Sequence, residues 1–293
     1  MYISVRDAMV AGDEFTSPAA GMRHLGVDAA EIALNRDFTA FAMDSKELVT
    51  LESDADAKAY KKHLDSLGIR ATSFLTACDF NSGDFESNVQ WITRALELAE
   101  VIGMPAIRID SAMSNERGLD FQTRVNIFAK GLGEALKRTA GSKVAMGIEN
   151  HGFQGNNLAF QLNVYKVAGS DRLGSTMDTG NFYWRGYPLS EVYGILTILA
   201  PHTKHTHLKN IKYPAEVRET MREAGWEYEK YVSPLDEGDI DHAKVLQILK
   251  EGGYQGDICI EDESLGHYAT PQERIAVLER DVAHVKSIIQ ALG

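Results

Sequence analysis

The sequence predicts an α/β fold in which eight parallel strands close into a single (β/α)8 barrel. Short β-like runs alternate with helical segments along the chain, and this alternation implies parallel pairing of the strands. The 293 residues have room for eight strand–helix units, and this length is usual for one barrel. No glycine-rich phosphate-binding motif follows the first strand, which argues against an open nucleotide-binding sheet.

The eight expected strands are short apolar runs. They comprise residues 2–5, 29–34, 69–75, 106–110, 144–149, 174–178, 204–210 and 257–261. The third run follows Gly68, and glycine readily takes the positive φ at which a preceding helix ends. In the fifth run Ala145, Gly147 and Glu149 share one face, because strand side chains alternate between faces. The opposite face carries bulky aliphatic residues that we expect to pack against the helices.

Helical segments are expected between the strands, the clearest at residues 17–25, 89–99, 121–139, 243–250 and 271–289. In the second of these, apolar residues recur at helical spacing and Gly103 ends the helix. The last segment has the strongest start signal, since Thr270 and Glu273 form a capping-box pattern around Pro271. Nothing after this helix suggests a second domain, so residues 1–293 are predicted to form one domain.

The composition predicts a cytoplasmic globular protein without nucleic-acid or membrane partners. The formal net charge is −12, whereas sequence-independent nucleic-acid binding relies on clustered Lys and Arg. Two cysteines, Cys78 and Cys259, are too few for a disulfide framework and suggest a reducing compartment. No signal peptide is visible, and no apolar run approaches the roughly 20 residues that span a bilayer. The oligomeric state stays open, with a homo-oligomer among the alternatives.

The last four expected strands end in residues that commonly bind metal ions: Glu149, Asp178, His207 and Glu261. In a parallel barrel these ends meet at one mouth, where three carboxylates would repel one another without a cation. Three carboxylates and one imidazole favour Mn²⁺, Mg²⁺ or Co²⁺, with Zn²⁺ as a further alternative. The sequence therefore predicts one divalent metal ion at the carboxyl ends of the strands.

Five further residues are candidates for substrate binding: Lys209, His151, Arg185, Glu31 and Arg108. Lys209 shares a strand face with His207, so it could contact substrate oxygens or form a salt bridge. His151 could carry a proton or support a metal ligand. The remaining three could line a sugar pocket or have structural roles, and aromatic neighbours of Arg185 could stack on a sugar ring.

Two features around the seventh expected strand have open roles. His205 shares the face of His207 but is expected deeper in the barrel. Residues 212–238 form an irregular segment that contains Trp226, Tyr228 and Tyr231. This segment follows a strand on the side where barrel loops build sites. It is either a wall or lid of the pocket or a surface insertion.

Four motifs together resemble the xylose isomerase-like TIM barrel superfamily, and more narrowly its sugar phosphate isomerase/epimerase family. They are Ile148-Glu149-Asn150-His151, Met177-Asp178-Thr179-Gly180-Asn181, Thr206-His207-Leu208-Lys209-Asn210 and Ile258-Cys259-Ile260-Glu261-Asp262. The resemblance covers nearly the whole chain. It is specific for the fold and the metal site but not for the substrate, because such folds host many reactions.

This resemblance implies a metal-dependent isomerase or epimerase of a sugar or sugar derivative, acting in carbohydrate metabolism on a small sugar or polyol. It implies that Glu149, Asp178, His207 and Glu261 bind one divalent metal, with manganese a typical ion. It also implies that Glu149 and Glu261 are the catalytic acid/base pair, moving protons through a metal-stabilised enediolate. The chain departs from the ketose-epimerase pattern at His151 and Asn181, so 3-epimerisation of a ketose is not carried over.

Three other functions are weighed against this one. A metal-dependent lyase or dehydratase acting on a keto-sugar or inosose-like substrate would use the same enediolate and then expel a leaving group. The nuclease branch of the superfamily needs a trinuclear zinc cluster with additional histidines, which this chain lacks, and its negative charge opposes DNA binding. A non-enzymatic sugar-binding protein is the third alternative.

Overall fold

A computed structural model describes all 293 residues and contains the predicted barrel. Eight parallel strands form one sheet in the order β12–β1–β2–β5–β6–β7–β8–β9. Their bounds are β1 Tyr2–Arg6, β2 Ala29–Ala33, β5 Arg70–Thr76, β6 Ala106–Ile109, β7 Ala145–Glu149, β8 Leu173–Asp178, β9 Thr203–His207 and β12 Asp257–Ile260. Between β9 and β12 the Leu208 amide donates to the Cys259 carbonyl, and the Glu261 amide donates to the Leu208 carbonyl. This bridge closes the barrel.

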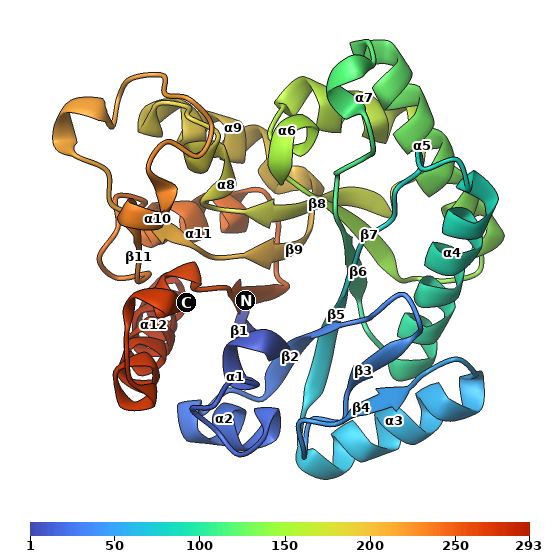
Figure 1. Cartoon of the computed structure of the whole chain (residues 1–293), viewed down its shortest axis with the longest axis horizontal. Helices are drawn as coiled ribbons and strands as arrows, with labels where there is room; N and C mark the ends of the chain where they lie inside the picture. Colours follow the sequence, from blue (N-terminus) through green and yellow to red (C-terminus); the bar gives the residue numbers. More distant parts are fainter.

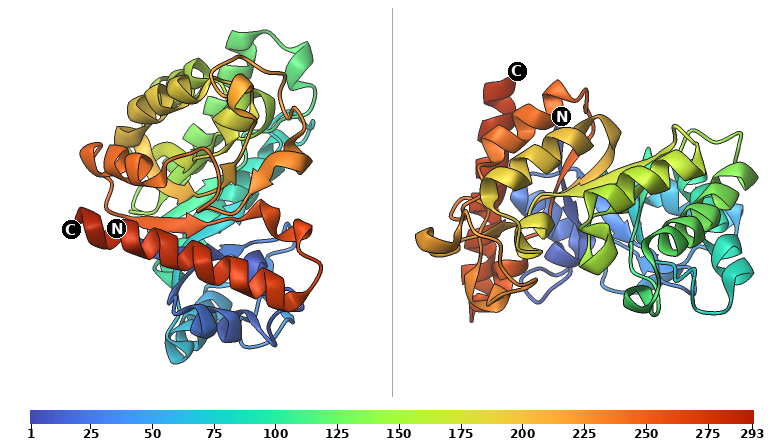
Figure 2. Two further views of the ribbon diagram at one scale, coloured as in Figure 1. Left: turned by 90° about the vertical axis from the view of Figure 1, so that its left-hand side faces the viewer. Right: turned by 90° about the horizontal axis from the view of Figure 1, so that it is seen from above.

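The helices lie around the outside of the strands (Figures 1 and 2). Their bounds are α1 Asp7–Val10, α2 Pro18–Leu25, α3 Asp54–Leu67, α4 Phe85–Ile102, α5 Phe121–Arg138, α6 Gly152–Gly155, α7 Leu158–Ala168, α8 Asn181–Trp184, α9 Leu189–Leu199, α10 Tyr228–Tyr231, α11 His242–Glu251 and α12 Pro271–Leu292. The expected alternation along β7 is confirmed, since Met146 and Ile148 belong to the hydrophobic core. No helix combines the length and apolar character needed to cross a membrane.

Two small sheets were not expected from the sequence. The hairpin of β3 (Thr39–Phe41) and β4 (Leu48–Thr50) follows β2, and β10 (Asn210–Ile211) pairs antiparallel with β11 (Val232–Ser233). The expected strand at 204–210 is therefore wrong at its end, because β9 stops at His207. Beyond that residue the Asn210 side chain bonds the carbonyls of Leu235 and Ile240, which turns the chain out of the barrel.

An arginine holds the irregular segment 212–238 against the barrel. The Arg222 guanidinium lies against the rings of both Tyr183 and Tyr213, 4.5 and 4.4 Å from their centroids. It also donates to the carbonyls of Tyr183 and Tyr187. A partly buried guanidinium that contacts rings and bonds carbonyls fixes two segments at once. The segment thereby brings Tyr228 to the barrel mouth, where its hydroxyl contacts Glu263.

The capping box predicted for the last helix is present. Thr270 accepts from the Glu273 amide, and the Glu273 carboxylate accepts from the Thr270 amide. Replacing Thr270 with Ala removes one acceptor for the free amides at the helix start, so we expect Thr270→Ala to lower the free energy of unfolding by about 1 kcal/mol. Denaturant unfolding measures this loss. Thr270→Ser keeps the hydroxyl and should unfold like the wild type; equal losses in both variants would contradict the capping role.

Candidate metal centre

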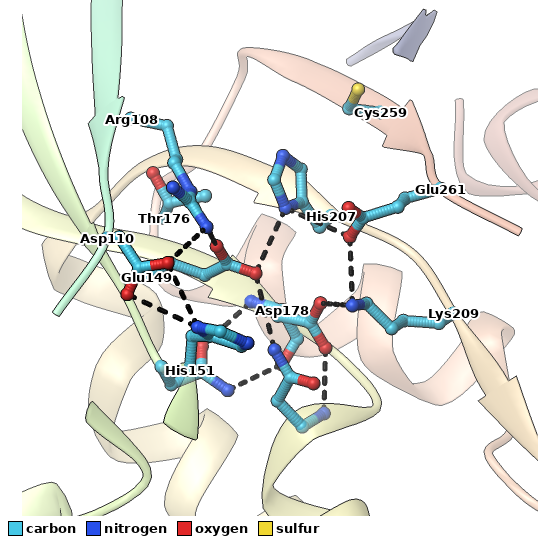
Figure 3. Close-up of polar contacts among 12 residues, drawn as sticks. Arg108, Asp110, Glu149, His151, Thr176, Asp178, His207, Lys209, Cys259 and Glu261 are labelled. Carbon is cyan, nitrogen blue, oxygen red and sulfur yellow. Dashed lines mark hydrogen bonds and ion pairs between the residues drawn. The ribbon is translucent and has the colours of Figure 1, made fainter. Parts of the chain in front are cut away.

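The four predicted metal ligands come together at the barrel mouth. Glu149, Asp178 and His207 are the last residues of β7, β8 and β9, and Glu261 directly follows β12. One ligand atom from each lies within 4.8 Å of the others, and all four residues are buried. Figure 3 shows their side chains converging from different strands. The strand ends that the sequence singled out therefore share one small space.

Asp178 is fixed by hydrogen bonds to the backbone around it. The Asn150 side chain accepts from the Asp178 amide at 2.8 Å and donates to the Asp178 carbonyl at 2.9 Å. Asp178 Oδ1 accepts from the amides of Gly180 and Asn181, at 2.8 and 2.7 Å. These bonds occupy one carboxylate oxygen and leave Oδ2 facing the centre, 3.1 Å from Lys209 Nζ.

Each of the two glutamates has its own arginine. Arg108 Nε donates to Glu149 Oε2 at 2.5 Å, and the Arg6 guanidinium donates to Glu261 Oε1. Burial alone would raise the pKa of Glu149, but Arg108 and then His207 outweigh it and lower this pKa. Burial also opposes ionisation of Glu261, yet His207, Lys209 and Arg6 hold its pKa well below the usual value. Both glutamates are therefore ionised.

His207 lies between Glu149 and Glu261, and a third glutamate, Glu31, contacts the opposite side of its ring. Its Nδ1 is 3.2 Å from Glu149 Oε1 and 3.1 Å from Glu261 Oε2. Its Nε2 lies 2.9 Å from Glu31 Oε2, and Glu31 Oε1 lies 2.9 Å from His205 Nε2. Burial opposes protonation of His207, but Glu261, Glu31 and Glu149 outweigh it and raise the pKa of this imidazole. Once Nδ1 gives up its proton while Nε2 still donates to Glu31, Nδ1 would offer a lone pair to a metal ion, which is the usual arrangement of a metal-binding imidazole.

His205 lies deeper in the barrel, as expected, and belongs to a satisfied network. Its Nδ1 lies 3.0 Å from Asp257 Oδ1, so both ring nitrogens are occupied. Glu31, His205, His207 and Cys259 form a second group of potential ligand atoms within 4.8 Å. Both nitrogens of the His205 imidazole are already bonded, so this second group does not form a metal site of its own. It holds Glu31, which in turn orients His207.

The donor set fits a divalent cation. Asp178 Oδ2 and Glu261 Oε2 are buried and accept no well-directed hydrogen bond, although Lys209 Nζ lies 3.1 Å from each. Burial raises the pKa of Asp178 to about 7; Lys209 opposes this rise, while Glu149 and Glu261 add to it. Two carboxylate oxygens and one imidazole nitrogen thus point at a common space in which the Lys209 ammonium supplies the positive charge. A divalent ion that displaced this ammonium would be held by these donors.

The predicted substrate-binding residues have four different placements. Glu31 and Arg108 are buried inside the ion-pair network, where they contact His207 and Glu149. Lys209 bridges Asp178 and Glu261, as Figure 3 shows. His151 is half-exposed and pairs with Asp110 at 3.0 Å, and this contact raises the pKa of His151. Arg185 ends α8, and its side chain makes none of the ion pairs of the centre.

Two residues that contact this network, Arg6 and Asp257, were not expected from the sequence. Arg6 ends β1 and pairs with Glu261, and Asp257 begins β12 and bonds His205 and Ser4. Strand alternation could have found both, because Arg6 shares a face with Ser4, and Asp257 shares a face with Cys259 and Glu261. Their partners lie more than 50 positions away in the chain, so the pairing itself needed the closed barrel.

Comparison with known proteins places this barrel in a family. Residues 20–288 match the model of the xylose isomerase-like TIM barrel family. The chain belongs to that family. No curated protein sequence gave a significant match.

Solved structures share the fold at low sequence identity. L-ribulose 3-epimerase aligns with TM-score 0.71 and 16% identity over 99% of this chain and 95% of its own. IolI, solved with a zinc atom, aligns with TM-score 0.71 and 16% identity over 97% and 98%. AsbF of Bacillus anthracis, a probable 3-DHS dehydratase involved in petrobactin synthesis, aligns with TM-score 0.65 and 15% identity over 98% and 99%. These similarities support the family's barrel architecture.

Lys209 should compete with a divalent cation, because its ammonium lies 3.1 Å from oxygens of two predicted ligands. Lys209→Met removes this resident charge, so we expect Mn²⁺ to bind at least tenfold more tightly, about 1.4 kcal/mol. Titration calorimetry on the purified variant and wild type measures the difference. Asp178→Asn, which removes a predicted ligand charge, should weaken binding instead. Equal affinities in wild type and Lys209→Met would contradict the competition.

Glu31 should control metal affinity without touching the metal. Glu31→Gln places an amide where the carboxylate accepts from His207, which weakens the orientation and basicity of that imidazole. We expect a roughly 10- to 100-fold loss of Mn²⁺ affinity. Glu47→Gln, an exposed change of the same charge, should bind like the wild type. Unchanged affinity in a folded Glu31→Gln protein would show that His207 needs no such support.

Proposed function

We propose that this protein is a divalent-metal-dependent isomerase or epimerase acting on a small sugar or sugar derivative. The observation that carries the proposal is the pairing of two ionised glutamates around one imidazole, with Asp178 completing the set. Structural neighbours titled L-ribulose 3-epimerase and D-tagatose 3-epimerase-like protein are consistent with this chemistry. The donors suit Mn²⁺, Mg²⁺ or Co²⁺, and IolI holds zinc.

Each of the proposed residues has its own role in proton transfer. A bound divalent cation would polarise a carbonyl and its neighbouring hydroxyl and stabilise the enediolate. One of Glu149 and Glu261 would remove the proton at the adjacent carbon, and the other, after taking a proton from solvent, would return one to that carbon. Arg108 and Arg6 keep these carboxylates ionised and oriented. Lys209 stands beside Glu261, where it would contact a substrate oxygen once released from Asp178.

Hydrogen exchange tests this proposal directly. In D₂O with Mn²⁺, a panel of ketoses and aldoses should yield an isomer carrying deuterium at the reacting carbon, detected by NMR. Because each glutamate moves a proton, Glu149→Gln and Glu261→Gln should each lower turnover by about 10²- to 10⁴-fold. Chelation should abolish exchange, and added Mn²⁺ should restore it. Full activity of either glutamine variant, or no affinity for any divalent metal, would overturn the proposal.

A lyase or dehydratase is the second candidate, favoured by the pair of His151 and Asp110. This pair lies beside Arg108 at the open edge of the site, and Asp110 raises the pKa of His151. A protonated imidazole there could donate to a departing hydroxyl. AsbF, titled a probable 3-DHS dehydratase, shares the barrel.

The two reactions differ in the product and in the effect of His151→Gln. Elimination would give an absorbing unsaturated ketone and would lose about 10²-fold or more in this variant. Isomerisation would give no such chromophore. Loss of isomer formation without any change in deuterium uptake would assign His151 to a step after proton removal.

A further inference from the structure

We propose that a polar cavity beside the metal centre is a second subsite, which binds a neutral sugar ring of an extended, unphosphorylated glycoside. This inference rests on the proposed function and specifies its substrate class. The cavity has a volume of about 600 Å³, within the roughly 300–1,000 Å³ typical of ligand sites. The loops after β2, β5 and β6 form it, on the carboxyl side of the barrel.

The cavity and the metal centre share a wall. Asp110 lines the cavity, and its carboxylate contacts Arg108 at 3.2 Å and His151 at 3.0 Å. Arg108 in turn donates to Glu149. Figure 3 shows these side chains lying side by side. A molecule seated against Asp110 would therefore be separated from Glu149 by the Arg108 side chain, and a second, linked ring would extend past this arginine toward the metal centre.

The charges of the lining favour a neutral ligand. One arginine, Arg36, faces three aspartates: Asp79, Asp84 and Asp110. A phosphate or carboxylate group would meet net negative charge there and would be repelled. Asp79 is already occupied, since it accepts from the amide and the hydroxyl of Ser114.

Arg36 provides the free donors that a sugar ring needs. Its guanidinium stacks 4.5 Å from the Trp91 ring centroid, and its one side-chain hydrogen bond is a long contact of 3.4 Å to Cys78 Sγ. No carboxylate pairs with it, unlike Arg108 and Arg6. A stacked, planar guanidinium presents a fixed pair of N–H groups, which match two neighbouring hydroxyls of a sugar. Met113 and Ala112 add an apolar surface for the ring carbons.

Saturation-transfer NMR and calorimetry on the Mn²⁺-loaded protein test the subsite. The probes are trehalose, sucrose, lactose and cellobiose, each compared with its component monosaccharides and with glucose 6-phosphate. At least one disaccharide should bind tenfold or more tightly than its monosaccharides, with signals from both rings, and glucose 6-phosphate should bind most weakly. If no disaccharide exceeds its monosaccharides, or if the phosphate binds best, the proposal is overturned.

Two tryptophan variants test whether the disaccharide preference arises in this cavity. Ala112→Trp fills the cavity from an exposed position, so it should remove the preference for the disaccharide and leave monosaccharide and Mn²⁺ binding unchanged. Ala140→Trp, exposed at the end of α5 and outside the cavity lining, should keep the preference. A preference that survives Ala112→Trp overturns the subsite.

Failure of the proposed function has a different signature. In that case deuterium exchange is missing in the Mn²⁺-loaded wild type, whereas the disaccharide preference and its loss in Ala112→Trp persist.

Discussion

Repulsion among buried carboxylates is the constraint on which this site depends. Glu149, Asp178 and Glu261 are buried with ligand atoms within 4.8 Å of one another, and Glu31 is buried on the other side of the His207 ring. Two like charges 4 Å apart repel by about 4 kcal/mol at an effective dielectric constant of 20, so the set needs compensation. The barrel provides it from several strands: Arg6 on β1, Arg108 on β6, the histidines on β9 and Lys209 just beyond. The order of the strands in the barrel thus determines which cations reach the buried carboxylates.

The compensating cations differ in how firmly they are held. Arg108 also donates to the Thr76 carbonyl at 2.9 Å and pairs with Asp110, so it is fixed on three sides. Lys209 has a flexible stem and a further partner in Glu263, at 2.6 Å near the surface. If Lys209 released both Asp178 and Glu261, it would keep this contact with Glu263. The ammonium is therefore the charge that can give way to a divalent ion, whereas the guanidinium groups stay and orient the glutamates.

The sequence was informative wherever local spacing determines the side of a strand to which a side chain points. Strand alternation placed Glu149 and His207 at the ends of their strands, and parallel closure brought those ends together. It could not show that Glu31 joins two histidines more than 170 positions away, because that contact exists only in the closed barrel. The turn of the chain after His207 was missed, since the bonds of Asn210 to Leu235 and Ile240 depend on the folded segment 212–238.

The site is asymmetric, because one side is covered by side chains and the other borders the polar cavity. On the β9–β12 side, Tyr228 and Glu263 contact each other and Lys209 pairs with Glu263, while Arg6 pairs with Glu261. On the β5–β6 side the polar cavity lies next to Asp110. Arg108 contacts both Asp110 and Glu149, so a ligand in the proposed subsite would lie on the Glu149 side of the centre. The two proposed acid/base groups would then differ in role, with Glu149 on the side of the cavity and Glu261 on the covered side.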